Sequence, residues 1–247
     1  DGKYWKNAHQ RCRLDTFTLS CERRKEGKRE MIKSVKLSFK VLVNVDPEDE
    51  TPDLSEVWFN TTYTVYPDAT VKVENEFLPV YYHAEREMSV PRIGQLFKLK
   101  GALETVDWYG RGPWENYADR KTSALVGRYR MLVKELAYAY VRPQENGYRT
   151  DVRELTLSSP EGNGMKVTGL PFFCFNAQYA PKENYEINGK PIRNTIDLKH
   201  EKDVFLNIDY GQMGVGGDNS WGNPVHVDYR VLLRNYRYGY VIQLFKE

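Results

Sequence analysis

The chain has few residues of the kinds that bind metals or form disulfides. Its 247 residues include three cysteines, Cys12, Cys21 and Cys174, with no CxxC or His/Cys spacing of the sort a structural zinc site needs. Cys12 and Cys21 lie in one extended-looking segment, where nine steps of ~3.3 Å put them beyond disulfide reach unless the chain turns. We therefore expect no metal site and three buried, reduced thiols, which favours a reducing compartment without excluding a periplasm.

Long apolar runs are also missing. No stretch of about 18 apolar residues occurs, so we expect no membrane-spanning helix. The chain does not open with a basic, then apolar, then small-residue leader, and it begins at Asp1 without a methionine. We expect a soluble protein that is a processed product or an excised piece of a longer one, and its compartment stays open.

No excess of charge of one sign is present either. The 36 basic and 34 acidic residues give a net charge of +2, and no tail or block carries the excess. Nucleic acid and anionic membranes are therefore poor candidate partners. What the chain does have is aromatic residues, 13% of the total with 18 tyrosines, which favour strands and surfaces for polar ligands.

Period-two alternation of apolar and polar residues dominates the sequence. It runs through 35–43, 71–77, 225–231 and 236–244, each of which we expect to be a half-buried antiparallel strand. No segment keeps a 3.6-residue period for long, although 181–187 could supply one or two helical turns.

Turn-forming residues separate these strands. Tyr-Pro-Asp-Ala at 66–69 is expected to join strands at 56–66 and 70–78, and similar turns are expected at 161–164 and 188–191. Many strands at regular spacing predict an all-β antiparallel sandwich. The acidic, proline-containing stretch 46–53 is interpreted as a surface loop, so 1–247 is expected to form a single domain.

Two segments, 106–121 and 211–222, interrupt the alternation with glycines, acids and aromatics. The glycines of the second are not a phosphate loop, because no Gly-Lys-Ser/Thr follows and the next elements are Pro224 and a strand. From pattern alone, Trp221 in this loop is somewhat more often a cap on the core than a ligand contact. Trp108 is expected in the core, and Trp114 is undecided.

The chain shows no catalytic set of its own. Glycoside hydrolysis needs two carboxylates with one kept protonated, and a hydrolase triad needs a serine in a nucleophile elbow beside a histidine. Most available acids lie beside arginines and are interpreted as ion-paired, and no histidine stands in such an elbow. The acids are Glu115, Asp119, Glu145, Asp151, Glu154 and Asp218, and the histidines are His9, His83, His200 and His226.

Three long motifs, in order, resemble the C-terminal region of large bacterial β-galactosidases of glycoside hydrolase family 2. Segment 110–120 reads Gly-Arg-Gly-Pro-Trp-Glu-Asn-Tyr-Ala-Asp-Arg, 140–149 contains Pro-Gln-Glu-Asn-Gly-Tyr-Arg, and 214–221 reads Gly-Val-Gly-Gly-Asp-Asn-Ser-Trp. A shorter Pro-Arg-Ile-Gly at 91–94 also matches. The resemblance covers roughly 91–247, and the N-terminal third is similar only in its strand pattern.

The resemblance implies a β-supersandwich similar to galactose mutarotases, and a parent enzyme that is a retaining hydrolase of terminal β-D-galactosides such as lactose. Its catalytic glutamates belong to a separate barrel domain, so no catalytic residue is expected in this chain, and the isolated chain is expected to be inactive. The expected partners are the β-galactoside and that barrel. The chain itself needs no cofactor. Whether the parent uses Mg or Na ions, forms a homo-oligomer, and lies in the cytoplasm or periplasm of a bacterium stays open.

The resemblance also implies residue roles. Trp221 would reach the mouth of the active site and pack on the sugar, with Asp218, Asn219 and Ser220 as its neighbours in substrate binding. Asn219 stands where the family has a second aspartate, and 181–200 is unlike the family. Structural roles are expected for two groups of motif residues, with the acids paired to Arg120 and Arg149: Glu115, Asn116, Asp119 and Arg120 in the first, and Glu145, Asn146 and Arg149 in the second.

Two other classes of function remain as alternatives. A stand-alone carbohydrate-binding module would use the same exposed aromatic residue without any catalytic partner. An aldose mutarotase is suggested by fold analogy alone and would need paired histidines and a carboxylate in one cleft.

Overall fold

A computed structural model describes residues 5–44, 56–80, 88–219 and 221–246. The chain is 57% strand and 8% helix, and its named strand pairs are all antiparallel, so the all-β expectation is confirmed. The strands are β1 (Cys12–Glu26), β2 (Arg29–Asn44), β3 (Glu56–Val65), β4 (Val71–Pro79), β5 (Arg92–Leu99), β6 (Thr105–Gly112), β7 (Leu125–Leu132), β8 (Arg149–Ser158), β9 (Asn163–Gln178), β10 (Glu186–Ile187), β11 (Lys190–Pro191), β12 (Val204–Gln212) and β13 (Tyr236–Lys246).

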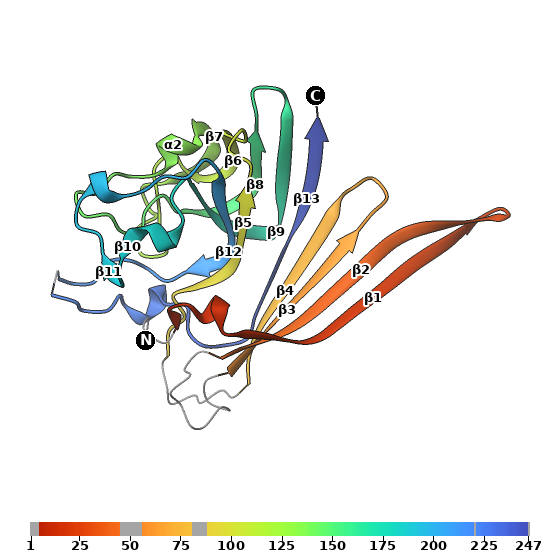
Figure 1. Ribbon diagram of the computed structural model, residues 1–247, viewed down its shortest axis with the longest axis horizontal. Coiled ribbons are helices and arrows are strands. Elements are labelled where there is room, and N and C mark those ends of the chain that lie inside the picture. The colour runs from red at the N-terminus through yellow and green to blue at the C-terminus, as the bar shows by residue number, and fades with distance from the viewer. Residues whose placement is uncertain (1–4, 45–55, 81–87, 220, 247) are drawn as a thin grey trace.

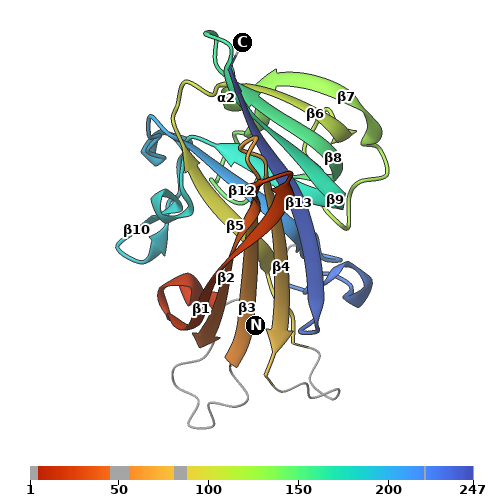
Figure 2. The same ribbon diagram turned by 90° about the vertical axis from the view of Figure 1, so that its right-hand side faces the viewer.

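Eleven of these strands form one sheet, in the order β1-β2-β3-β4-β13-β9-β8-β6-β7, with β12 pairing both β9 and β5. Long β9 joins three neighbours, because it pairs with β8 along most of its length, with β13 in its N-terminal part and with β12 in its C-terminal part. In Figure 1 the sheet bends around the core, while the β1–β2 hairpin extends away from the rest of the molecule. Figure 2 shows β1 to β4 side by side beneath the layer of β6 to β9.

The core lies between the two parts of this bent sheet. Alternate residues of the strands that surround it point into it, as the sequence pattern predicts. Its fully buried members include Val73 from β4, Val106 from β6, Leu155 and Leu157 from β8, Phe173 and Phe175 from β9, Leu206 and Ile208 from β12, and Tyr240 from β13.

The expected turns are present. Residues 66–69 connect β3 to β4, with Ala69 in the left-handed region at φ 62° and the Thr70 N–H donating to the Asp68 carboxylate at 3.0 Å. The turn at 188–191 joins β10 to β11, and a short 3-10 helix at Lys182–Tyr185 supplies the helical turn expected within 181–187. Other helical pieces are single turns: Ala8–Gln10, Val133–Leu136, Thr195–Asp197 and Val227–Tyr229.

The strand expected at 225–231 is wrong. This segment is a loop that contains the 3-10 turn Val227–Tyr229. The backbone N–H groups of Tyr229 and Arg230 donate to the carbonyls of His226 and Val227, so the chain coils locally instead of extending. Alternation of valine and tyrosine with polar residues therefore misled the interpretation of a loop that keeps only Val225 and Val231 buried.

The burial expected for the cysteines is also wrong in part. All three are free, as expected, but Cys12 and Cys21 are exposed and Cys174 is half-buried. The reason is that β1 is an edge strand, and all fifteen of its residues are exposed. The acidic stretch 46–53 lies outside the described residues. No helix among the described residues has the length and apolar character to cross a membrane.

Candidate functional site

Asp119 connects the first sequence motif to the third. Its two carboxylate oxygens accept the backbone N–H groups of Val215 at 3.1 Å and Gly216 at 2.7 Å. The loop 213–224, which follows β12, is further held by backbone bonds from Met213 to Pro91 and from Gly214 to Tyr229. Segments distant in the sequence therefore fix the base of the loop that carries Trp221.

Glycines allow this close approach. A Cβ on Gly214 would lie 2.6 Å from the Asp119 carboxylate carbon, and one on Gly217 would lie 2.2 Å from the Asn223 carbonyl oxygen. Both distances are shorter than van der Waals contact allows. The glycine-rich pattern thus serves to fold the loop on itself and against Asp119, rather than to bind phosphate.

Trp221 stands at the exposed end of this loop, with 92% of its surface accessible. Its backbone N–H donates to the Asn219 side-chain oxygen at 2.9 Å, and Gly222 follows in the left-handed region at φ 97°. Asp218 contacts the His226 ring at 2.7 Å, and both side chains are solvent-exposed. Ser220, also predicted to bind substrate, lies outside the described residues. The indole is therefore not a cap on the core.

Glu115 links the first and second motifs through hydrogen bonds. Its carboxylate accepts from Arg120 at 2.6 Å, from the Gly147 N–H at 2.7 Å and from the Tyr140 hydroxyl. Burial is the main cause that raises the pKa of Tyr140, and the adjacent Glu115 carboxylate adds to it. These contacts join 115–120 to the loop that precedes β8.

Two asparagines satisfy backbone groups inside the same region. The buried Asn116 side-chain oxygen accepts both the N–H and the hydroxyl of Thr150, at 2.9 and 2.6 Å. Asn146 accepts the Tyr138 N–H at 3.0 Å and donates to the Gln144 carbonyl at 2.8 Å. Each amide thus replaces a backbone partner where the chain has no neighbouring strand.

Arg149 is buried and donates to three backbone carbonyls, of Pro113, Leu136 and Gly147, each at 2.9 Å. It therefore binds the first motif to the second. Loss of hydration lowers the pKa of its guanidinium to about 10. The expectation that an acid of the second motif would pair with Arg149 differs from the structure, because Glu145 pairs with Arg92 instead, at 2.8 Å.

The buried cluster around Arg92 was not predicted from the sequence. Arg92 on β5 donates to Gln212 at 2.9 Å, and its Nε lies 3.4 Å from the fully buried carboxylate of Asp209 on β12. Burial raises the pKa of Asp209 to about 6, although Arg92 opposes the rise. One sequence signal could have indicated this cluster. Asp209 directly follows the alternating apolar residues Leu206 and Ile208, and it pairs with Gly94 on β5.

The other acids named from the sequence are paired. Asp151 lies 2.5 Å from Arg111 and 3.2 Å from Lys121, and Glu154 lies 3.1 Å from Arg128. Burial alone would raise the pKa of Asp151, but the hydrogen bonds from these two cations bring it below its usual value. Within the described ranges, no three His, Cys, Asp or Glu side chains are grouped to hold a metal ion.

The two tryptophans of segment 106–121 differ in their exposure to solvent. Trp108 is buried, as expected, and its indole N–H donates to the Arg111 carbonyl at 2.9 Å. Trp114 is about half exposed beside the first motif. Trp108 therefore belongs to the core, while Trp114 and Trp221 present aromatic surface to solvent.

Comparison with solved structures finds chains of low similarity. A galactose mutarotase related enzyme from Lactobacillus acidophilus aligns with a TM-score of 0.39 and 10% identity, over 92% of this chain and 71% of that one. An aldose epimerase homologue from C. elegans aligns with a TM-score of 0.42 and 14% identity, over 92% and 68%.

Comparison by sequence is more specific. β-Galactosidase from Priestia megaterium is 39% identical over 168 residues, which are 68% of this chain and 16% of that protein. β-Galactosidase from Alteromonas mediterranea is 31% identical over 218 residues, which are 81% of this chain and 20% of that protein. The chain thus spans only a fifth or less of these relatives. Residues 1–242 match the family described as β-galactosidase small chain, and the chain belongs to that family.

Proposed function

We propose that this chain is an accessory, C-terminal domain of a retaining β-galactosidase that hydrolyses terminal β-D-galactosides such as lactose. In this proposal residues 1–247 form one domain that completes the wall of the active site, and Trp221 contacts the sugar. The catalytic glutamates are supplied by a barrel in the remainder of the enzyme. Family membership supports the parent activity, and the exposed indole carries the residue-level part.

The geometry of the tryptophan loop favours a binding role. An indole with 92% of its surface in water exposes a large apolar area, which is favourable to cover. Its loop is held at the base by Asp119 and follows a strand that is paired on both sides. Little backbone conformational freedom would therefore be lost on binding. An aromatic face held in this way suits the C–H face of a sugar ring.

The state of the acids supports catalysis elsewhere. Glu115, Glu145 and Asp151 are each ion-paired to an arginine. Asp209, whose pKa burial raises to about 6, is fully buried and cannot reach a substrate. A retaining glycosidase needs one protonated and one ionised carboxyl at about 5–5.5 Å with access to the sugar, which these acids do not offer.

Substitution of Trp221 in the complete enzyme tests the proposal. Trp221→Ala should raise KM about 5- to 30-fold for lactose with a much smaller change in kcat, since lost aromatic contact costs ~1–2 kcal/mol. Trp221→Phe should restore part of the affinity. Leu244→Ala, an exposed apolar residue on β13, is the control and should leave KM unchanged. An unchanged KM in Trp221→Ala would reject sugar contact at this position.

The carbohydrate-binding module remains the second candidate, because the same exposed indole would serve it. The two candidates differ in what the chain does alone. An incomplete active-site wall should bind galactose and lactose too weakly for calorimetry and should hydrolyse no nitrophenyl galactoside. Millimolar or tighter binding by the chain alone would favour the module, and turnover would contradict the accessory role.

A further inference from the structure

One face of the sheet formed by β1 to β4 and β13 becomes more exposed to solvent toward β1. Three cross-strand rows of residues on this face run from β13 through β4, β3 and β2 to β1. The rows are Tyr240-Val73-Tyr63-Leu37-Leu19, Tyr238-Asn75-Thr61-Phe39-Phe17 and Tyr236-Phe77-Phe59-Val41-Leu14.

Each row is buried at β4 and exposed at β1. Val73 and Phe77 belong to the hydrophobic core, whereas Leu19 is 64%, Leu14 55% and Phe17 48% exposed. The change is gradual, because Phe39 in the middle of its row packs against Phe17 at 5.0 Å between ring centres and is half-buried. The apolar face of the core therefore continues onto the β1–β2 hairpin, where no described residue covers it.

The opposite face of the same strands is mostly polar, apart from the row Leu42-Trp58-Leu78. The row Thr18-Ser38-Thr62-Glu74 crosses β1 to β4, and Ser38 and Thr62 hydrogen-bond to each other at 3.1 Å. Surface strands normally keep this alternation only where one face is buried. An alternation maintained to the exposed edge thus indicates a face that is covered in the complete protein.

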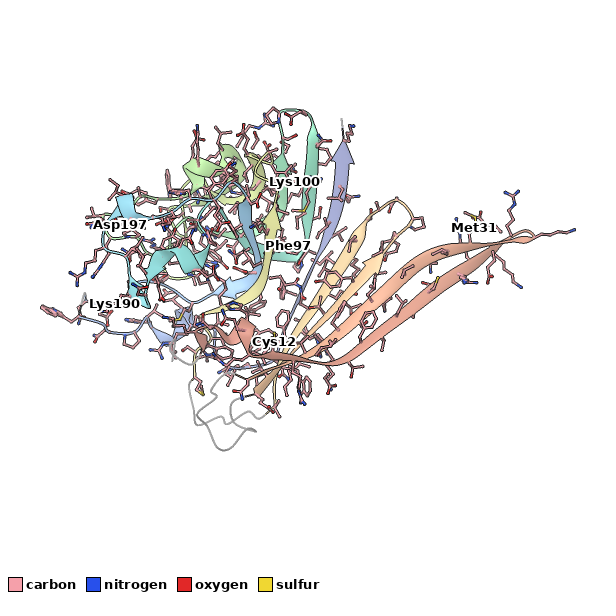
Figure 3. All side chains as sticks on the ribbon, in the orientation of Figure 1. Cys12, Met31, Phe97, Lys100, Lys190 and Asp197 are labelled. Atoms are coloured by element: carbon pink, nitrogen blue, oxygen red, sulfur yellow. The ribbon has the colours of Figure 1, made fainter. Side chains whose placement is uncertain are left out.

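The hairpin also projects from the molecule. Figure 3 shows Cys12 at its base, next to the core, and Met31 near its far end. Met31 and Ile32 are exposed near that end. A two-stranded ribbon with an uncovered apolar face has little stability of its own in water, so a partner layer would stabilise it.

We propose that the apolar face of β1 and β2, defined by Leu14, Phe17, Leu19, Cys21 and Leu37, is the docking surface for β-strands from the part of β-galactosidase that precedes these residues. Two observations favour this occupant. The matched region is only 16% of the Priestia megaterium enzyme, so most of that enzyme lies outside it. Trp5, just before β1, packs on Phe77 at 6.1 Å between ring centres, so the chain leading into β1 already crosses this face.

The proposal of this docking surface rests on family membership and is independent of any role of Trp221. A second copy of the chain is the competing occupant. Edge-to-edge pairing of two copies along β1 would leave the apolar face uncovered, and face-to-face packing of two copies would cover it only at protein concentrations that keep the copies associated. A layer from the preceding part of the enzyme covers the face itself.

Thiol labelling of the complete enzyme tests this surface. Cys21 pairs with Val35 and lies on the apolar face, whereas the adjacent Ser20 pairs with Lys36 and lies on the polar face. The Ser20→Cys variant places both thiols in one protein. Alkylation rates by iodoacetamide, measured for each site by peptide mass spectrometry and normalised to the urea-unfolded protein, should be at least 10-fold slower at Cys21 than at the introduced position 20 thiol.

The outcomes separate the occupants. Protection of Cys21 that persists on dilution to monomer, checked by sedimentation, supports the proposal. Equal rates at the two positions overturn it, and protection lost on dilution assigns the face to a second copy.

A pair of charged variants gives a second measurement. Leu19→Asp should shorten the half-life of thermal inactivation at least fivefold, while Thr18→Asp on the opposite face should not. Equal half-lives would also overturn it, and neither result depends on KM.

Discussion

The Asp119 carboxylate accepts the Gly216 N–H at 2.7 Å, across 97 residues of sequence. This bond and its companion to Val215 are the direct connection between the loop after β6 and the loop that carries Trp221. The backbone that carries the indole therefore depends on an acid from a different loop.

Asp119→Ala should loosen the tryptophan loop. We expect faster amide hydrogen exchange at Val215 and Gly216, and a rise in KM of about fivefold, since two charge-assisted hydrogen bonds at a partly exposed site contribute about 1 kcal/mol. Asp228→Ala, an exposed acid in the same region, is the control and should change neither quantity. Unaltered exchange at both amides would show that the loop is held by its other contacts.

Gly94 should tolerate no side chain. A Cβ there would lie 1.7 Å from the Asp209 carboxylate oxygen, so Gly94→Ala must displace the acid from Arg92 or push β5 from β12. We expect a loss of about 2–4 kcal/mol of unfolding free energy, measured by urea denaturation. The matched control is Gly211→Ala at the end of the same strand pair, where nothing lies within 4 Å of the added Cβ. Similar stability of both variants would mean that the site is not tightly packed.

Arg149 should matter more for stability than an exposed arginine. Arg149→Met leaves the carbonyls of Pro113, Leu136 and Gly147 without their donor in a buried site, and we expect a loss of about 3 kcal/mol or more of unfolding free energy. Arg130→Met, which removes the exposed ion pair with Asp107, should leave the stability nearly unchanged. Comparable midpoints in urea for the two variants would contradict this assignment.

Stability should depend on the titration of Asp209. Its folded pKa of about 6 lies above an unfolded value of about 3.9, so the folded state binds the proton more tightly. The contribution to stability is complete below about pH 4 and is lost as the pH rises through 6, a change of about 3 kcal/mol. Arg92 and Lys182 face the same carboxyl and lower its pKa, and Glu145 raises it, but burial is the largest cause.

The Asp209→Asn variant cannot titrate at this position. Relative to the unmodified chain, its unfolding free energy should therefore increase between pH 4 and pH 7. Urea titrations at pH 4.5, 5.5 and 7 would measure the difference. A constant difference across this range would mean that the Asp209 pKa is not raised in the folded protein.

Sequence periodicity and the turn at 66–69 predicted β2, β3, β4 and β13, because an inward residue at every second position is the direct consequence of strand geometry. It failed at 225–231, where valines alternate with polar residues by chance and local 3-10 bonds determine the conformation. It also gave no warning that β1 lies at an edge, since alternation does not encode which strands pair with which. The exposure of Cys12 and Cys21 follows from pairing order, which a single sequence does not encode locally.

The motifs indicated where side chains converge, but not which atoms meet. Glycine, acid and aromatic residues marked the loops at 110–120 and 211–222, and the structure brings these loops together through Asp119. The pairing of Glu145 with Arg92, instead of Arg149, could not be derived, because it depends on the neighbourhood of β5 and β12 in the sheet. Predicted contact of Trp221 with substrate stays a prediction.

The placement of β12 between β5 and β9 has a consequence for engineering of the chain. A one-residue insertion between Leu206 and Ile208 would shift the register against two neighbours at once and turn one of these two side chains away from the interior. The exposed turn at Asn188–Gly189 joins strands of two residues each, so extra residues there should be absorbed without disturbing the sheet. A tag or fused domain is therefore best introduced at that turn.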